Sequence, residues 1–276
     1  MKSKSLLLMN PATTFLLALA SAGMLAAFLT ASVSAEDESE VTDDDLVLAR
    51  SPIIIKSRVR VSDEYTDLEG GGSRNKFIFA GVYGFGFNGH DRDFGVSFEL
   101  PVLENNPNVG NNESGVGDFK LRFGQLIMDD PGGWRTGWFG ETEFDTAADD
   151  VQAIANQRTQ MAIGAGAAYP ISSNFVLASS LQFGWSADKG ETTGNKSEWE
   201  AHLTATVKLP EHVSLNLDYK AVVNMVDNAK LFNTLEPSIG WIVGKESNIG
   251  LFASCEIPLD DPATNCIAKA GVNWFF

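Results

Sequence analysis

Alternation of apolar and polar residues is the feature of this sequence that most limits its fold. Between residues 53 and 276, twelve segments carry no Asp, Glu, Lys, Arg or His on one of their two alternating sets of positions, and most hold charged residues on the other. A period of two is typical of a β-strand and does not come from a helix. In a soluble sheet the outward face carries the charge, whereas a transmembrane barrel turns apolar side chains outward to lipid and polar side chains inward. The pattern therefore predicts an all-β transmembrane barrel.

The twelve segments have lengths that suit a membrane. At about 3.3 Å per residue and a tilt of about 45°, they rise by roughly 20–30 Å, which brackets a hydrocarbon layer. We therefore expect an up-and-down antiparallel barrel. Its strands are predicted at residues 53–61, 77–87, 94–102, 119–127, 134–144, 161–169, 175–185, 199–209, 213–225, 235–243, 249–259 and 266–276.

Short connections alternate with longer ones along this part of the chain. Asn88-Gly89 and Asp130-Pro131-Gly132-Gly133 are typical of tight turns. The longer links include residues 62–76, 103–118 and 145–160. Outer-membrane barrels have short periplasmic turns, longer external loops and an even number of strands. We therefore expect the outer membrane of a Gram-negative bacterium, with both termini in the periplasm.

The N-terminal part predicts export. Lys2 and Lys4 precede an apolar stretch from residue 15 to 29, and Val33-Ser34-Ala35 supplies small residues for cleavage. The apolar stretch is shorter than the roughly 20 residues that span a bilayer as a helix, so a cleaved signal peptide at residues 1–35 is favoured over a retained anchor. Residues 36–50 are strongly acidic and predict a disordered periplasmic segment, with a partly inserted plug as the alternative. Residues 51–276 then form the barrel.

Charge and cysteine content restrict the partners. The formal net charge of −16 opposes nucleic-acid binding, which needs a basic surface. Cys255 and Cys266 form no metal motif, and we expect no metal and no cofactor. Both cysteines fall on the outward face of adjacent predicted strands, where they are either a disulfide or two unpaired thiols. Acidic residues gather in the predicted outer loops, where they are simply solvated or bind divalent cations that bridge to lipopolysaccharide.

Two motifs that suggest enzymes have simpler explanations. Gly84-Phe85-Gly86-Phe87-Asn88-Gly89 matches G-x-G-x-x-G, but a turn and another strand follow it instead of the helix that a dinucleotide site needs. The three histidines, His90, His202 and His212, lie in turns or on the inward face, and no nucleophile-elbow serine accompanies them. We therefore expect no enzymatic activity.

The inward face is where a function would reside. Its charges can pair across strands and stabilise the interior, or they can line a polar passage in which Lys56, Arg58, Arg60, Lys120 and Arg122 form a basic ladder. Sequence alone leaves both interpretations open. The candidate residues lining the lumen are Lys56, Arg58, Arg60, Asp118, Lys120, Arg122, Glu141, Glu143, Glu200, His202, Asp218 and Lys220.

One short motif resembles a known family. Ser114-Gly115-Val116-Gly117-Asp118, which enters the fourth predicted strand at Phe119-Lys120-Leu121, is similar to the S-G-[LV]-G-D entry of the outer-membrane family named for the meta-cleavage pathway of phenol degradation. Its members are regarded as transporters, so the resemblance implies uptake of small solutes, with aromatic and other hydrophobic compounds as candidates. It also implies that the barrel-assembly machinery recognises the C-terminal aromatic residue, here Phe276. It supplies no catalytic residues.

The expected function is a narrow channel for passive uptake of small solutes. Barrels of eight strands are filled by side chains and barrels of sixteen enclose an aqueous channel, so twelve strands predict a constricted passage. An acidic outer mouth favours neutral or cationic solutes. Two alternatives stay open: a non-conducting barrel for structure or surface display, and an outer-membrane lipid hydrolase. The expected partners are outer-membrane lipids, lipopolysaccharide and a small solute.

Overall fold

Antiparallel strands form almost all of the regular structure in the part of the chain that the structure describes. The computed structural model describes residues 57–68, 72–86, 93–107, 110–130, 133–155, 158–187, 197–225, 230–243, 248–260 and 264–276. The predicted signal peptide at residues 1–35, the acidic segment at residues 36–50 and Lys56 lie outside these residues. No helix within the described ranges has the length and apolar character needed to cross a membrane.

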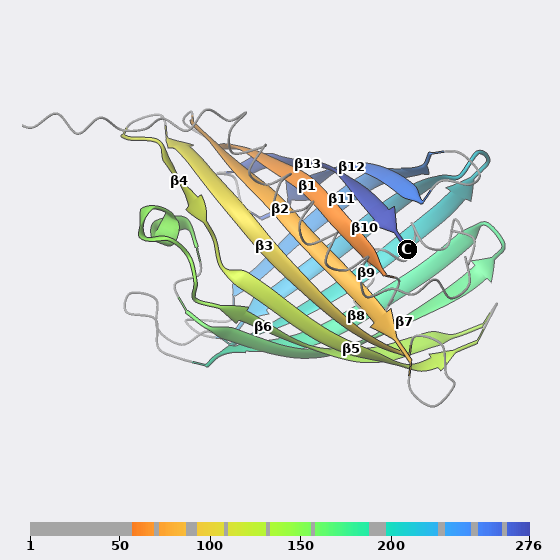
Figure 1. Ribbon diagram of the computed structural model, residues 1–276. Helices are drawn as coiled ribbons and strands as arrows, with labels where there is room; N and C mark the ends of the chain where they lie inside the picture. Colours follow the sequence, from red (N-terminus) through yellow and green to blue (C-terminus); the bar gives the residue numbers. More distant parts are fainter. Residues whose placement is uncertain are drawn as a thin grey trace, which may run out of the picture. The chain divides into compact units, whose positions relative to one another are not determined.

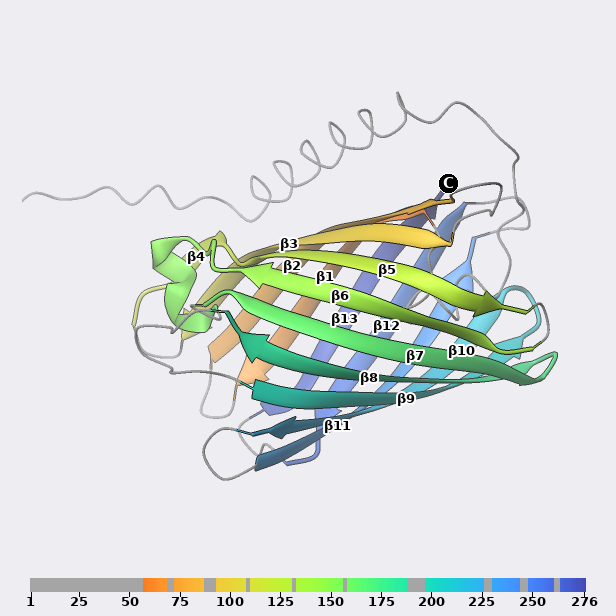
Figure 2. The ribbon, with the colours of Figure 1, turned by 90° about the horizontal axis from the view of Figure 1, so that it is seen from below.

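Twelve of the described strands close into an antiparallel barrel, which confirms the predicted all-β barrel and its strand number. β1 pairs with β2 on one side and with β13 on the other. From β13 the strands pair in order back to β5, and β5 pairs with β3. The pair β2–β3 then closes the barrel (Figures 1 and 2). β4 pairs only with β3, as an extension beyond the barrel wall. The elements are β1 (Arg58–Leu68), β2 (Gly72–Phe85), β3 (Phe94–Pro107), β4 (Glu113–Val116), β5 (Phe119–Asp129), β6 (Arg135–Phe144), the 3-10 helix η1 (Asp149–Ile154), β7 (Gln160–Ser172), β8 (Phe175–Ser186), β9 (Ser197–Leu209), β10 (Val213–Asn224), β11 (Lys230–Ile242), β12 (Ile249–Pro258) and β13 (Thr264–Phe275).

The first strands are longer than the sequence predicts. The segment predicted at 53–61 appears as β1 over Arg58–Leu68, and most of the predicted link 62–76 belongs to β1 and β2. Asp63 pairs in register with Phe77, and Asp67 with Ser73. Backbone hydrogen bonds continue this ladder where the side chains are no longer apolar, because ladder pairing does not require a lipid face. The alternation rule therefore located the strand and missed its polar end.

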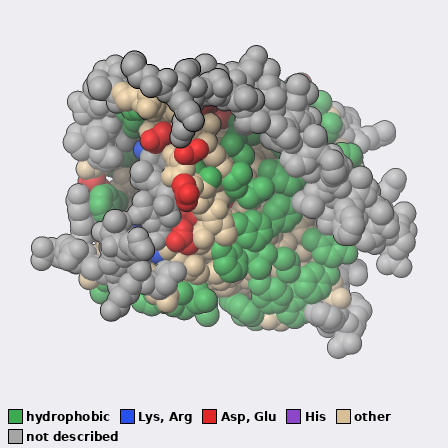
Figure 3. Space-filling model, turned by 60° about the vertical axis from the view of Figure 1, so that its left-hand side comes forward, with side chains coloured by type: hydrophobic (Ala, Val, Ile, Leu, Met, Phe, Trp, Pro, Cys, Tyr) green, Lys and Arg blue, Asp and Glu red, His purple; other side chains and the backbone are tan. Residues whose placement is uncertain are grey.

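The outward side of the barrel is apolar. Exposed side chains there include Ile163, Leu181, Leu203, Leu217 and Ile239. Figure 3 shows a continuous hydrophobic surface with a row of acidic side chains along one edge. Asp63 and Asp67, both exposed, occupy outward positions of β1 beyond its apolar part. This arrangement matches an apolar band that lies in hydrocarbon, with the extended strand ends in water.

Aromatic side chains mark both ends of this outward face. At the end that holds Phe276, the rings of Phe85, Phe94, Phe123 and Trp138 form a chain with centroid separations of 5.9, 6.0 and 5.8 Å. Near the opposite end, Phe183 lies 5.9 Å from Trp185 and 5.0 Å from Trp199. Rings at two levels are typical of the aromatic girdles of a transmembrane barrel.

The β6–β7 connection is fixed at the end of the barrel where β4 lies (Figure 1). The Asp118 carboxylate accepts hydrogen bonds from the backbone N–H groups of Thr146 and Ala147, both at 3.0 Å. Val151 of η1 is completely buried, and a side chain at Gly115 would lie only 3.0 Å from the Ala148 Cβ. Asp118, predicted to line the lumen, instead anchors this connection.

Cys255 on β12 and Cys266 on β13 form a disulfide, with a Cα–Cα distance of 6.2 Å. Both occupy the outward face, because Cys255 lies opposite Ala268 and Cys266 follows on the same parity. The bond joins two strands that already pair along their length, and it closes their hairpin near the β4 end. Of the two alternatives that the sequence left open, the structure has the disulfide.

Candidate functional site

A cavity of about 470 Å³ lies inside the barrel. Its lining comes from β1, β2, β3, β5 and β6, and from β8 to β13. Glu143 and Lys220 are not part of this lining: Glu143 lies 3.4 Å from Lys120, which lines the cavity, and Lys220 lies 3.0 Å from Glu256, which does not. The predicted lumen residues that line the cavity are Arg58, Arg60, Lys120, Arg122, Glu141, Glu200, His202 and Asp218.

One side of the lumen carries a ladder of ion pairs that follows from strand register. Lys120 lies opposite Glu143, and Arg122 opposite Glu141, on the inward face of β5 and β6. The Arg122 Nε donates to Glu141 at 2.8 Å, and Lys120 lies 3.4 Å from both Glu141 and Glu143. We call the following nine inward charged residues of β1, β2, β3, β5 and β6 the first wall: Arg58, Arg60, Glu64, Lys76, Glu99, Lys120, Arg122, Glu141 and Glu143.

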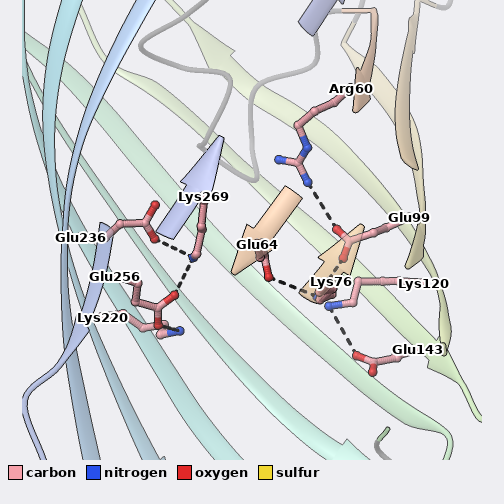
Figure 4. A network of polar contacts seen from close by, with 10 residues as sticks. All are labelled: Arg60, Glu64, Lys76, Glu99, Lys120, Glu143, Lys220, Glu236, Glu256 and Lys269. Carbon is pink, nitrogen blue, oxygen red and sulfur yellow. Dashed lines mark hydrogen bonds and ion pairs between the residues drawn. The ribbon is translucent and has the colours of Figure 1, made fainter. Parts of the chain in front are cut away.

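Glu99 joins the rest of the first wall. Its carboxylate lies 3.5 Å from the Arg60 guanidinium and 3.6 Å from the Lys76 ammonium, and Lys76 lies 3.9 Å from Glu64 (Figure 4). Glu99 is thus shared between two cations at long distances. Glu64 was predicted to lie in an outer loop, although it continues the inward positions of Arg58 and Arg60.

The strands that follow on the other side of β1, from β13 to β10, carry a second network. Lys269 of β13 lies 2.9 Å from Glu236 and 2.5 Å from Glu256, and Lys220 of β10 lies 3.0 Å from Glu256 (Figure 4). The network spans four strands, from β10 to β13, because long side chains reach across an intervening strand. We call the following seven inward residues of β9 to β13 the second wall: Glu200, His202, Asp218, Lys220, Glu236, Glu256 and Lys269.

His202 is held by two carboxylates. Its Nδ1 lies 3.1 Å from Asp218 and its Nε2 lies 2.7 Å from Glu200, while the Thr204 hydroxyl donates to Asp218 at 2.6 Å. Ser180 lies opposite His202 in the β8–β9 ladder. A hydrolytic base needs a ring nitrogen that can take the proton of the nucleophile. Both nitrogens of His202 face carboxylates, so the histidine belongs to the charge network rather than to a catalytic triad.

The two walls differ in charge, and an uncharged sector separates them on one side. The first wall has five cations against four carboxylates, whereas the second has two lysines and His202 against four carboxylates. Between them, the inward positions of β7 and β8 hold small or neutral residues: Ala162, Gly164, Gly166, Ala168, Ala178, Ser180 and Gln182. A solute in the cavity therefore meets charge on two sides and an uncharged surface on the third.

Two inward phenylalanines were not singled out from the sequence. Phe139 is almost fully buried, with the Arg122 guanidinium 5.0 Å above its ring. Phe252 lines the cavity. Each packs on a glycine of the neighbouring strand, Gly164 and Gly271 respectively. An aromatic residue on the inward parity opposite a glycine is a pattern that could have identified them.

Known proteins share this architecture. An outer membrane channel from Pseudomonas putida F1 matches with a TM-score of 0.66 at 12% identity, over 88% of this chain and 100% of that one. The NanC porin matches with a TM-score of 0.55 at 10% identity, over 79% and 98%. The KdgM porin in complex with disordered oligogalacturonate matches with a TM-score of 0.52 at 8% identity, over 79% and 99%. At these identities the likeness is one of fold.

The family match covers nearly the whole barrel. No curated protein matches the sequence. A family described as "Putative MetA-pathway of phenol degradation" matches residues 59–276, from the start of β1 to the C-terminal residue. This match confirms the resemblance noted at Ser114–Asp118. The chain belongs to the family of the MetA pathway of phenol degradation.

Proposed function

We propose that the protein is an outer-membrane channel for passive uptake of small solutes. The observation that carries the proposal is a polar cavity of about 470 Å³ enclosed by a barrel with an apolar exterior. A polar interior is costly inside a protein unless it is paired or hydrated. The cavity is within the size range of small-molecule sites.

The family points to the class of solute. Its description refers to phenol degradation, and aromatic or other hydrophobic compounds of that size fit the cavity. The channel from Pseudomonas putida F1 and the two porins share the fold, which is consistent with conduction. Small aromatic solutes are therefore the substrate class that we propose.

The proposed orientation follows from the connections. The two-residue turn at 173–174 and the turn at 210–212 lie at the barrel end that holds Phe276, whereas β4 and η1 lie at the other end. We place the short turns in the periplasm and the β4 end outside, where acidic side chains meet lipopolysaccharide and its bound cations. Phe276 then faces the barrel-assembly machinery.

Planar-bilayer recording of the refolded protein tests the channel. We expect discrete conductance steps in KCl and faster swelling of proteoliposomes in small neutral solutes than in oligosaccharides. Protein that is folded, as judged by heat-dependent migration in gels, and that gives neither conductance nor swelling would contradict the proposal.

A non-conducting structural barrel is the second candidate, and the dense pairing of the two walls favours it. Paired charges stabilise the interior whether or not a solute passes. Arg58→Ala and Lys120→Ala discriminate between the two functions. In a channel these variants change the ion selectivity of a folded protein, whereas in a structural barrel they change only its stability.

A further inference from the structure

Arg60 makes a long contact with its carboxylate partner in the first wall. Its contact with Glu99 is 3.5 Å, and its Nε is enclosed without a hydrogen-bond partner among the residues that the structure describes. The side chain is 30% exposed, and it lines the cavity. In Figure 4 one terminal nitrogen of Arg60 faces Glu99 while the other points away from it. The guanidinium therefore has donor capacity directed into the lumen.

Glu99 cannot satisfy this capacity. The same carboxylate lies 3.6 Å from Lys76 and interacts electrostatically with Lys120 and Arg122. Arg122 has a closer partner in Glu141, at 2.8 Å. The nine residues of the first wall comprise five cations and four carboxylates, and the terminal nitrogen of Arg60 that points away from Glu99 can donate to an additional anion. A charge-assisted hydrogen bond from a guanidinium to a carboxylate is stronger than a hydrogen bond between neutral groups.

The neighbours of Arg60 add an amide and an aromatic ring. Asn273 lies opposite Arg60 in the β1–β13 ladder, is 4% exposed, and has an Oδ1 without a hydrogen-bond partner in the described part of the chain. Gly271, the preceding inward position of β13, lies opposite both Ser62 and Phe252. A Cβ at Gly271 would be 2.6 Å from the Phe252 Cε1, so the ring of Phe252 lies over this glycine toward β1.

We propose that Arg60 and Phe252 form a subsite in the lumen that binds a small aromatic carboxylic acid. The carboxylate of the acid contacts Arg60, and its ring packs against Phe252. Both residues line the same cavity. This inference rests on the proposed function, because it names the substrate class of that channel. It also distinguishes an aromatic acid from a neutral phenol, which lacks the carboxylate, and from acetate, which lacks the ring.

Isothermal titration calorimetry of the full-length folded protein in detergent tests the subsite without requiring conduction. The probes are benzoate, phenol and acetate at the same ionic strength. We expect benzoate to bind at least about tenfold more tightly than acetate or phenol, because each control lacks one of the two contacts. In planar bilayers, benzoate should also interrupt the KCl current in a concentration-dependent manner.

Variants locate the binding. Arg60→Gln should weaken benzoate binding at least about tenfold, because it removes the charge-assisted contact. Phe252→Leu should weaken it about threefold and leave acetate binding unchanged, because the ring contact is lost. Arg135→Gln is the matched control, since Arg135 pairs with Asp129 at 2.8 Å near the β5–β6 turn, and it should bind benzoate like the parent protein. If Arg60→Gln does not fold, Arg60→Lys keeps the charge but not the planar guanidinium that can contact Glu99 and the acid at the same time, and it should still weaken binding.

The outcomes separate the two proposals. Equal binding of benzoate and acetate, or benzoate binding that is unchanged in Arg60→Gln and Phe252→Leu, would overturn the subsite even if the protein conducts. Specific benzoate binding without conductance or swelling would support the subsite and overturn the channel. Loss of benzoate binding in Arg135→Gln as well would show a general charge effect and would also overturn the subsite.

Discussion

The lipid-facing and lumen-facing sides of each strand follow opposite rules. Leu181 on the outward side of β8 is 51% exposed, whereas its neighbour Gln182 lines the cavity opposite Glu200. Charge is absent from the outward positions in the middle of the described strands, and it is concentrated and paired on the inward positions. We infer that the outward side chains determine insertion into the membrane, whereas the inward side chains can determine which solutes pass.

The largest effect should come from a charge on the wrong side. We expect Leu181→Arg to lower the free energy of unfolding by about 2–4 kcal/mol, the cost of a charge on the lipid face near the midplane. Gln182→Arg places the same side chain one residue away, facing Glu200, and should change stability by less than about 1 kcal/mol. Urea unfolding in lipid vesicles measures both. Equal losses would contradict the assignment of the two faces.

Glu141 tests the pairing of the first wall. Glu141→Gln removes the carboxylate shared by Lys120 and Arg122, and we expect a loss of about 2 kcal/mol in the free energy of unfolding. The additional positive charge in the lumen should also shift the reversal potential in a KCl gradient toward chloride selectivity. Glu113→Gln makes the same change on β4, outside the barrel wall, and should alter neither quantity appreciably. An unchanged reversal potential in Glu141→Gln would indicate that ions do not pass this wall.

Lys269→Gln tests the second wall, and the expected change in ion selectivity has the opposite sign to that of Glu141→Gln. Lys269→Gln leaves Glu236 and Glu256 without their shared cation, so the reversal potential should move toward potassium selectivity. The loss of stability should be smaller, roughly 1.5 kcal/mol, because Lys220 stays 3.0 Å from Glu256. A shift in the same direction as that of Glu141→Gln would contradict an electrostatic origin of selectivity.

Sequence predicted the barrel well because membrane physics acts on single positions. A charge in hydrocarbon is excluded wherever it occurs, so parity alone identified the twelve strands and the inward positions of Lys120, Arg122 and Glu141. The polar ends of strands are not under this constraint. The extension of β1 through Asp63 and Asp67 was therefore missed. For the same reason Glu64 was assigned to the loop predicted at residues 62–76.

The partners of the inward residues could not be predicted because they depend on register. Parity places Asp118 inward, but only the fold shows that its carboxylate binds the backbone of Thr146 and Ala147. Likewise, parity places His202 inward, but only the fold shows that carboxylates lie at both of its ring nitrogens. Which residues meet across strands is set by long-range pairing, which a single sequence does not encode position by position.

The smallest effect should come from one methyl group on the inner side. A Cβ at Gly164 would lie 2.5 Å from the Phe139 ring and 2.8 Å from the Gln182 Cβ. Phe139 is 1% exposed and has little space in which to move, so Gly164→Ala should lower the free energy of unfolding by about 1 kcal/mol through overpacking.

Gly140 is the matched control on the outward side, where the atom nearest to an added Cβ would be 3.9 Å away. Gly140→Ala should be neutral or stabilise the protein by up to about 1 kcal/mol, because the unfolded chain loses freedom. If the two substitutions had equal effects on urea unfolding, the inner side would not be packed as tightly as the Phe139 contact requires.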